Sequence, residues 1–152
     1  MVRSTTTCAG VLVAALLISA CGSSSSKSHK AGHATRPSRI YRLSLSGSAE
    51  VPRGAPHGSG AAILAWHGET KVCWRFAHLH GFSGATVAHI HAGSKGRSGK
   101  IVLPLSTGTR LHHEGCVPIS PTLTKAIWRD PSRYYVNIHS TQYPAGAVRA
   151  QL

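Results

Sequence analysis

From Ile40 to Leu152 the sequence is a series of short runs in which apolar and polar residues alternate. In "IYRLSLSG" (40–47), Tyr41, Leu43 and Leu45 alternate with polar residues. A period of two places successive side chains on opposite faces of an extended strand. Further runs of this kind, punctuated by glycine and proline, cover residues 58–68, 70–79, 85–92, 100–105, 134–140 and 147–152. The pattern predicts an all-β domain over residues 40–152.

One segment between these runs departs from the alternation and is typical of a short helix. In "PISPTLTKAIWRDP" (118–131), Ser120 can cap a helix, Pro121 suits its first position and Pro131 ends it. The expected fold is an antiparallel two-sheet sandwich of Ig-like, Greek-key type, with about seven or eight strands and one short helix. A β-barrel is the alternative.

The first 20 residues have the features of an export signal. Arg3 precedes the apolar run "AGVLVAALLIS" (9–19), which is too short to span a bilayer comfortably. The next residues, "ISAC" (18–21), resemble the bacterial lipobox, in which the cysteine becomes the lipidated first residue of the mature protein. We therefore expect a lipoprotein signal peptide (1–20) and anchorage through Cys21 to the outer face of the cell membrane. An ordinary cleaved signal peptide without lipid is the alternative.

Residues 21–39 follow the signal and contain almost no large apolar side chains. They begin with Cys21 and continue through serines and scattered basic residues to Arg39. Such a composition cannot bury enough apolar surface to fold, so we expect a disordered basic linker. The folded domain is then predicted to be residues 40–152.

The four cysteines are consistent with export. Cys8 lies in the signal peptide and Cys21 is the expected lipidation site, which leaves Cys73 and Cys116. Because an exported chain is in a disulfide-permissive environment, we predict a Cys73–Cys116 disulfide. Closing a loop of that length would stabilise the fold by roughly 4 kcal/mol. Two free thiols would require a reducing compartment, which conflicts with export.

The charge of the chain is strongly one-sided. It contains 17 Lys and Arg residues against 4 Asp and Glu residues, a formal net charge of +13. This balance favours anionic partners such as phospholipid headgroups, anionic surface polymers or acidic glycans. The export signal argues against nucleic acid. The turn "GSKGRSG" (93–99) carries two of the cations and is interpreted either as a plain hairpin turn or as an anion-binding loop.

Two of the predicted strands combine an apolar face with a face that carries imidazoles. In "AHIHAG" (88–93), His89 and His91 lie on the same face, and in "YYVNIHS" (134–140) Asn137 and His139 share one face. If the two strands are neighbours, His89, His91 and His139 converge. Three imidazoles with an open position form a ligand set for Zn²⁺ or Cu²⁺.

Two other interpretations of these histidines stand beside the metal site. The imidazoles could belong to a hydrogen-bonded structural network with Glu50, Asn137 and Arg149, because buried imidazoles need partners. They could also face solvent. The other histidine pairs, His78 with His80 and His112 with His113, are more typical of strand-end and loop positions.

No catalytic arrangement can be recognised, so we expect a protein that is not an enzyme. The carboxylates of the folded domain are Glu50, Glu69, Glu114 and Asp130, and they are scattered along the sequence. No serine lies in a nucleophile-elbow context. The two cysteines of the domain are expected to be oxidised.

Five segments together resemble the CHRD domain, first described in chordin: "LSGSAEVP" (45–52), "AHIHAG" (88–93), "GKIVLPL" (99–105), "YYVNIHS" (134–140) and "YPAGAVRAQL" (143–152). The resemblance implies a β-rich extracytoplasmic module, which in chordin occurs beside binding modules for secreted signalling proteins, and it implies no catalytic residues. We therefore expect a binding module at the cell surface, whose partners would be secreted proteins or, from the basic charge, anionic surface polymers. Its recurrent polar positions correspond here to Glu50, His89, His91, Gly93, Asn137, His139, Gly146 and Arg149. Ala147 and Ala150 replace an acidic residue and a glycine of the family pattern.

Overall fold

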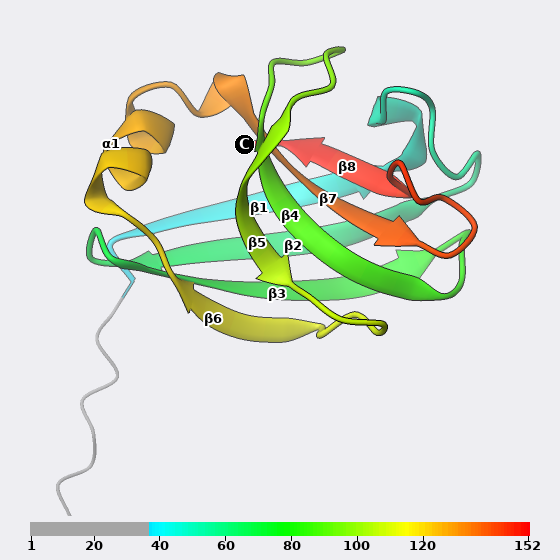
Figure 1. Ribbon diagram of the computed structural model, residues 1–152, viewed down its shortest axis with the longest axis horizontal. Coiled ribbons are helices and arrows are strands. Elements are labelled where there is room, and N and C mark those ends of the chain that lie inside the picture. The colour runs from blue at the N-terminus through cyan, green and yellow to red at the C-terminus, as the bar shows by residue number, and fades with distance from the viewer. Residues whose placement is uncertain (1–36) are drawn as a thin grey trace, which may run out of the picture. The chain divides into compact units, whose positions relative to one another are not determined.

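The strands of the fold follow the alternating runs closely (Figure 1). The computed structural model describes residues 37–152; the expected signal peptide, Cys21 and most of the expected linker lie outside them. The strands are β1 (Arg39–Ser46), β2 (Ser59–His67), β3 (Lys71–His80), β4 (Ala85–Ala92), β5 (Lys100–Ser106), β6 (Glu114–Pro118), β7 (Tyr134–Ser140) and β8 (Val148–Gln151). The expected all-β class is confirmed.

Hydrogen bonds join the eight strands of residues 37–152 into one sheet, in the order β5-β4-β7-β8-β1-β2-β3-β6. All its pairings are antiparallel. The sheet curls so that β4 and β5 pass across β1, β2 and β3, and it is nearly closed (Figure 1).

The expected sandwich of two separate sheets is therefore not confirmed. The two four-stranded halves are joined where β1 pairs with β8, at the single register pair Ser46↔Arg149. This narrow junction lets the halves pack face to face while remaining one sheet, which is closer to the barrel alternative.

The inner face of the curled sheet carries the hydrophobic core. Leu64 and Trp66 from β2 pack in the same cluster as Ile90 from β4 and Val136 from β7, and all four are completely buried. These residues occupy alternate positions of their strands, as the period of two predicts. The opposite set of positions on every strand therefore points outward.

The predicted helix forms as α1 (Pro121–Arg129). The Ser120 hydroxyl accepts a hydrogen bond from the Leu123 N–H and caps the helix, and Pro121 lies in the first turn. Ile127 is completely buried and fixes the helix against the core. Short 3₁₀ turns lie at Gly47–Ala49 and Pro131–Arg133.

The predicted disulfide between Cys73 and Cys116 is present. It links β3 to β6 at directly opposed positions of the two strands, and it lies on the outward set of β3 residues with Arg75 and Ala77. Strand β6 itself was not predicted, because only intermediate and exposed residues alternate along it. Within the described residues, no helix is long and apolar enough to cross a membrane.

Candidate metal centre

The outer face of β4 and β7 brings the three predicted histidines together. His89 and His91 project from β4, and His139 projects from the adjacent strand β7. The register places Asn137 opposite His89 and Tyr135 opposite His91. The neighbouring strands and the shared face that the sequence pattern required are therefore both present.

The three imidazoles are close enough to share one ion. One ring nitrogen from each of His89, His91 and His139 lies within 4.8 Å of the other two. Nδ1 of His89 and Nε2 of His139 are 3.2 Å apart. Ligand nitrogens about 2.1 Å from a tetrahedral zinc ion are roughly 3.4 Å from each other, so this pair already has the required separation. Any pair at the 4.8 Å limit would need side-chain rotations that bring its two nitrogens about 1.4 Å closer.

Backbone carbonyls fix the proton positions of two of the rings. Nδ1 of His91 is 2.8 Å from the Gly99 carbonyl oxygen, and Nδ1 of His139 is 2.8 Å from the Pro144 carbonyl oxygen. A carbonyl can only accept, so each Nδ1 carries the proton and each Nε2 presents a lone pair. Metal-binding histidines are oriented by this kind of second hydrogen bond.

The contact between His139 and His89 requires a proton or a cation between the two rings. Nε2 of His139 has no proton in this tautomer, so it cannot donate to Nδ1 of His89. Two lone pairs would repel at 3.2 Å. The two nitrogens can therefore approach this closely only if Nδ1 of His89 carries a proton or if a cation lies between them. The observed separation is compatible with either arrangement.

His91 contributes a buried acceptor that lacks a partner. The residue is 7% exposed, and within residues 37–152 its Nε2 atom has no hydrogen-bond partner. A buried polar atom without a partner costs about 1–3 kcal/mol, so native structures rarely leave one unfilled. A metal ion at the meeting point of the three rings would satisfy this atom.

Burial keeps His89 and His91 in the neutral form that binds metal. Removal from water, together with the nearby rings of His139 and His91, lowers the pKa of His89 to about 4. Burial also lowers the pKa of His91, although the hydrogen bond to Gly99 partly opposes that shift. At neutral pH neither ring has to lose a proton before it can bind a cation.

Tyr135 holds His91 in place through its ring. The two rings stack with centroids 4.6 Å apart and an interplanar angle of 8°. The Arg149 guanidinium carbon lies 3.4 Å from the centroid of the same tyrosine ring, in a cation–π contact. The Tyr135 hydroxyl accepts a hydrogen bond from the Gly99 N–H. Tyr135 thus connects β8 and the turn before β5 to the metal-facing histidine.

The residues predicted as polar partners form a second group beside the histidines. Burial raises the pKa of Glu50 to about 7, against the opposing effects of the Asn137 hydrogen bond and the Arg149 charge. The Asn137 side chain also opposes the lowering of the His91 pKa. Within residues 37–152, however, Oε1 of Glu50 and Oδ1 of Asn137 are buried without a hydrogen-bond partner, as is Nε2 of His91. These residues lie beside the histidines, but they do not form a closed hydrogen-bonded network.

The segment 93–99 covers this layer from outside. Arg149 donates hydrogen bonds to the carbonyls of Arg97 and Ser94, while the Gly99 carbonyl accepts from His91. A side chain at Gly99 would collide with the Ala92 backbone. The segment connects the antiparallel strands β4 and β5, as the hairpin interpretation predicted, and its backbone also positions the histidine layer.

The remaining histidine pairs do not join the cluster. His78 and His80 are exposed at the end of β3, and His112 and His113 are exposed before β6. Among residues 37–152, His89, His91 and His139 form the one group with metal-binding spacing. Full solvent exposure is wrong for His91, whereas His89 and His139 are half-buried and leave the centre accessible.

Sequence reasoning missed Tyr135, Gly99 and Pro144 as supports of the centre. Tyr135 has a signal in the sequence, because it precedes Asn137 and His139 at spacings of two and four on the same strand face. Gly99 and Pro144 act through backbone carbonyls, which every residue type supplies. Their role has no signature in the residue identities.

The arrangement of the three imidazoles is suitable for binding a cation through nitrogen ligands. Three imidazoles suit Zn²⁺ or Cu²⁺, and a fourth position is left for water or a ligand. The model of the CHRD domain family matches residues 41–152. Searches among curated proteins and among solved structures found no match to the chain.

Proposed function

Because the chain belongs to the CHRD domain family, we propose that it is an exported binding module that holds one Zn²⁺ or Cu²⁺ ion through His89, His91 and His139. The family suggests an extracellular binding module, and the disulfide suits an oxidising compartment. The observation that carries the metal proposal is the convergence of three ring nitrogens, two of them with lone pairs fixed by backbone carbonyls.

The donor set favours a borderline transition metal over other ions. Ca²⁺ and Mg²⁺ prefer oxygen ligands, whereas the three donors here are imidazole nitrogens. Soft ions such as Cu⁺ prefer thiolates, and both described cysteines are in the disulfide. Zn²⁺ and Cu²⁺ match imidazole best.

We propose a binding role and no catalysis. Glu50 is the carboxylate of this layer, and it interacts with Asn137, Arg149 and the Val51 backbone. It is not part of the group of three imidazoles with metal-binding spacing. A bound ion would therefore be held without an adjacent general base. Secreted proteins or anionic surface polymers would be the partners of such a module.

The metal proposal is tested with untagged chain purified after expression with added zinc or copper. We expect about one ion per chain by elemental analysis and at least hundredfold weaker binding for H139A in a competition titration. H112A is the matched control, because His112 is an exposed histidine outside the cluster. An unchanged affinity in H139A, or no bound ion in the wild type, contradicts the proposal.

The cellular location adds a separate proposal, lipid anchorage at Cys21, which lies outside the described residues. The support is the sequence "ISAC" after an apolar run of signal-peptide length. Mass spectrometry of the mature N-terminus should find an acylated Cys21, and C21S should be released from the membrane. A mature chain that begins elsewhere, or C21S that stays anchored, contradicts it.

A further inference from the structure

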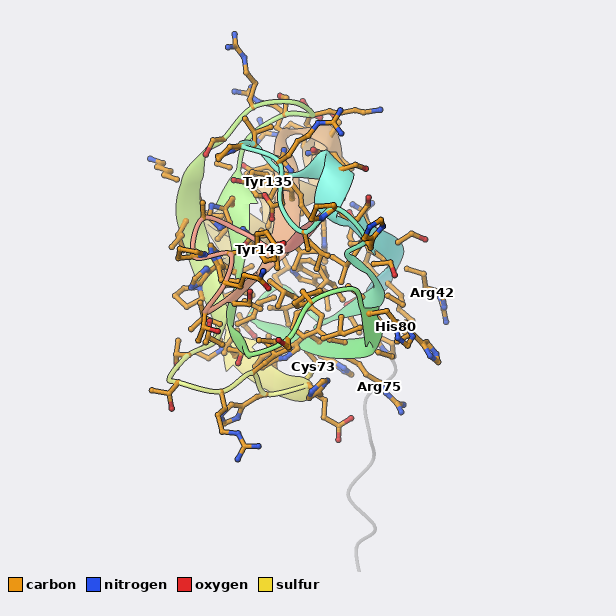
Figure 2. The ribbon with its side chains drawn as sticks, turned by 90° about the vertical axis from the view of Figure 1, so that its right-hand side faces the viewer. Arg42, Cys73, Arg75, His80, Tyr135 and Tyr143 are labelled. Atoms are coloured by element: carbon orange, nitrogen blue, oxygen red, sulfur yellow. A yellow bond between two sulfur atoms is a disulfide. The ribbon has the colours of Figure 1, made fainter. Side chains whose placement is uncertain are left out.

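A second outer surface lies on the other half of the sheet, and nothing in residues 37–152 covers it. We call it the open face. It consists of the outward-pointing residues of β1, β2 and β3, in three registered rows: Ile40, Ala65 and Cys73; Arg42, Ile63 and Arg75; Ser44, Ala61 and Ala77. In Figure 2, Arg42 and Arg75 lie on the side of the fold away from Tyr135 and Tyr143.

The open face exposes apolar side chains on a flat background. Ile40 is 39% exposed and Ile63 is 37% exposed, two of the three large apolar residues that are exposed in the described chain. Three of the neighbouring positions are alanines (Ala61, Ala65 and Ala77), whose short side chains leave the isoleucines prominent. A shallow hollow of about 250 Å³ is lined by Ile63, Arg75 and His78 together with Ala61 and Ala77. Ile40 and Ile63 are diagonal neighbours on adjacent strands, and contiguous exposed apolar groups mark surfaces that contact another phase or partner.

Positive charge brackets the apolar centre. Arg42 and Arg75 lie directly opposite Ile63 on its two neighbouring strands. Adjacent strands are about 4.8 Å apart, so the two arginine backbones are about 10 Å apart with Ile63 between them. Lys71 lies two outward positions further along β3, beyond Cys73, and Glu114 on β6 lies directly opposite Arg75. The face therefore has Ile63 in the middle, Arg42 on one side and Arg75, with the acidic Glu114 beyond it, on the other.

We propose that the open face docks on the surface of an anionic phospholipid bilayer. Arg42 and Arg75 would bind headgroup phosphates while Ile40 and Ile63 enter the interfacial region, which is the arrangement of interfacial protein surfaces. Long arginine side chains can reach phosphates while their apolar stems stay beside the isoleucines.

The chemistry of the face favours a bilayer over the other possible occupants. A second copy of the chain would place Arg42 and Arg75 against like charges. A soluble anionic polymer would satisfy the arginines but would offer no apolar phase for the exposed isoleucines. A bilayer satisfies both. The proposal does not depend on the metal centre, which lies on the other half of the sheet.

Residues 34–152 are suitable for the test on their own. The strands, the core cluster and the disulfide all lie within them, and they form one compact unit. Testing this unit removes Cys21, so any binding is independent of the lipid anchor. The proteins are sedimented with vesicles of phosphatidylcholine, with and without phosphatidylglycerol.

We expect binding to the anionic vesicles and little to the neutral ones. R42Q/R75Q should bind about thirtyfold more weakly, which corresponds to about 1 kcal/mol for each basic residue near an anionic surface. I40S/I63S should also bind more weakly, at unchanged charge. The matched control R97Q/R133Q removes the same charge from exposed residues outside the open face and should lose at most about fivefold. Circular dichroism confirms that each variant is folded.

Three results would overturn the proposal. The first is equal binding to neutral and anionic vesicles, or none to either. The second is an equal loss in R97Q/R133Q, which would show general charge attraction without a docking face. The third is that R42Q/R75Q abolishes a dimer in sedimentation velocity, or binding to a soluble polyanion, without affecting vesicle binding.

Discussion

The outer surfaces of the two halves belong to the same continuous sheet, but they differ in what covers them. On β4, β7 and β8 the outward residues are histidine, asparagine, tyrosine and arginine, and segment 93–99 closes over them. On β1, β2 and β3 the outward residues are mainly alanine, isoleucine and arginine, and they are partly or fully exposed. The covered face can fix side chains for a metal ion, whereas the open face can only present them.

The comparison shows where function enters a fold of this kind. The inward residues of both halves are mainly hydrophobic, and they pack together in one core. The outward residues carry the differences. A connection long enough to fold back, such as residues 93–99 between β4 and β5, turns an outward row into a site. Where connections are short, as in the turn between β2 and β3, the row stays open.

The largest expected effect concerns the disulfide, which braces the open side. C73S/C116S should lower the free energy of unfolding by about 4 kcal/mol, because the bond closes a loop with a sequence separation of 43 residues. Urea denaturation measures the change. Metal affinity should stay unchanged while the variant is folded, because the bond is on the other half of the sheet. A loss of metal binding in the folded variant would show that the metal site depends on the disulfide, which would contradict the independence of the two faces.

The next effect is a pH dependence that belongs to the covered face. The folded protein raises the pKa of Glu50 from 4.5 to about 7, so folded Glu50 holds its proton more tightly than unfolded Glu50. The contribution of Glu50 to stability is then fully present below pH 4.5 and is lost as the pH rises through 7, by about 3 kcal/mol. The lowered pKa values of His89 and His91 act in the opposite direction, because their contribution is lost as the pH falls below 6.5. E50Q should remove most of this fall in urea denaturation. E114Q, an exposed position of β6, should keep it; the reverse pattern would contradict the assignment.

A smaller effect is expected from the tyrosine that supports His91. Y135L removes the stack on His91 and the contact with Arg149, and it should weaken metal binding about tenfold, as loss of an outer support typically does. Y135F keeps the stack and loses only the hydroxyl, so it should weaken binding less. Competition titration ranks the three proteins. Equal affinity in Y135L and the wild type would show that the stack does not position His91.

The smallest effect should come from the centre of the open face. I63T should change the free energy of unfolding by no more than about 0.5 kcal/mol, because Ile63 is 37% exposed and points away from the core. Thermal unfolding of the unit in the absence of vesicles measures it. A destabilisation of several kcal/mol would show that Ile63 is packed against something, and the face would then not be open.

The sequence was sufficient to predict which side chains meet but not how the sheet closes. Alternation placed His89 and His91 on one face and put His139 on the matching face of another strand, so their convergence needed only that the strands be neighbours. The choice between one sheet and two depends on the pairing of Ser46 with Arg149. One backbone pairing between two strands produces no hydrophobic periodicity or motif from which it could be predicted.

Two features of the structure, strand β6 and the orientation of the histidine rings, leave no recognisable pattern in the sequence. Strand β6 is short and lacks buried residues, so hydrophobic alternation could not reveal it. The proton positions of His91 and His139 depend on carbonyls from Gly99 and Pro144, which are brought close by the path of two connections. Residue identities predicted the candidate ligands, while backbone carbonyls orient two of their rings.

X-ray absorption spectroscopy of the zinc-loaded chain tests the central claim most directly. The account predicts one ion per chain with three imidazole nitrogens at about 2.0 Å and one oxygen ligand such as water, reduced to two imidazoles in H139A. A coordination shell of oxygen or sulfur alone, or the same three imidazoles in H139A, would contradict it.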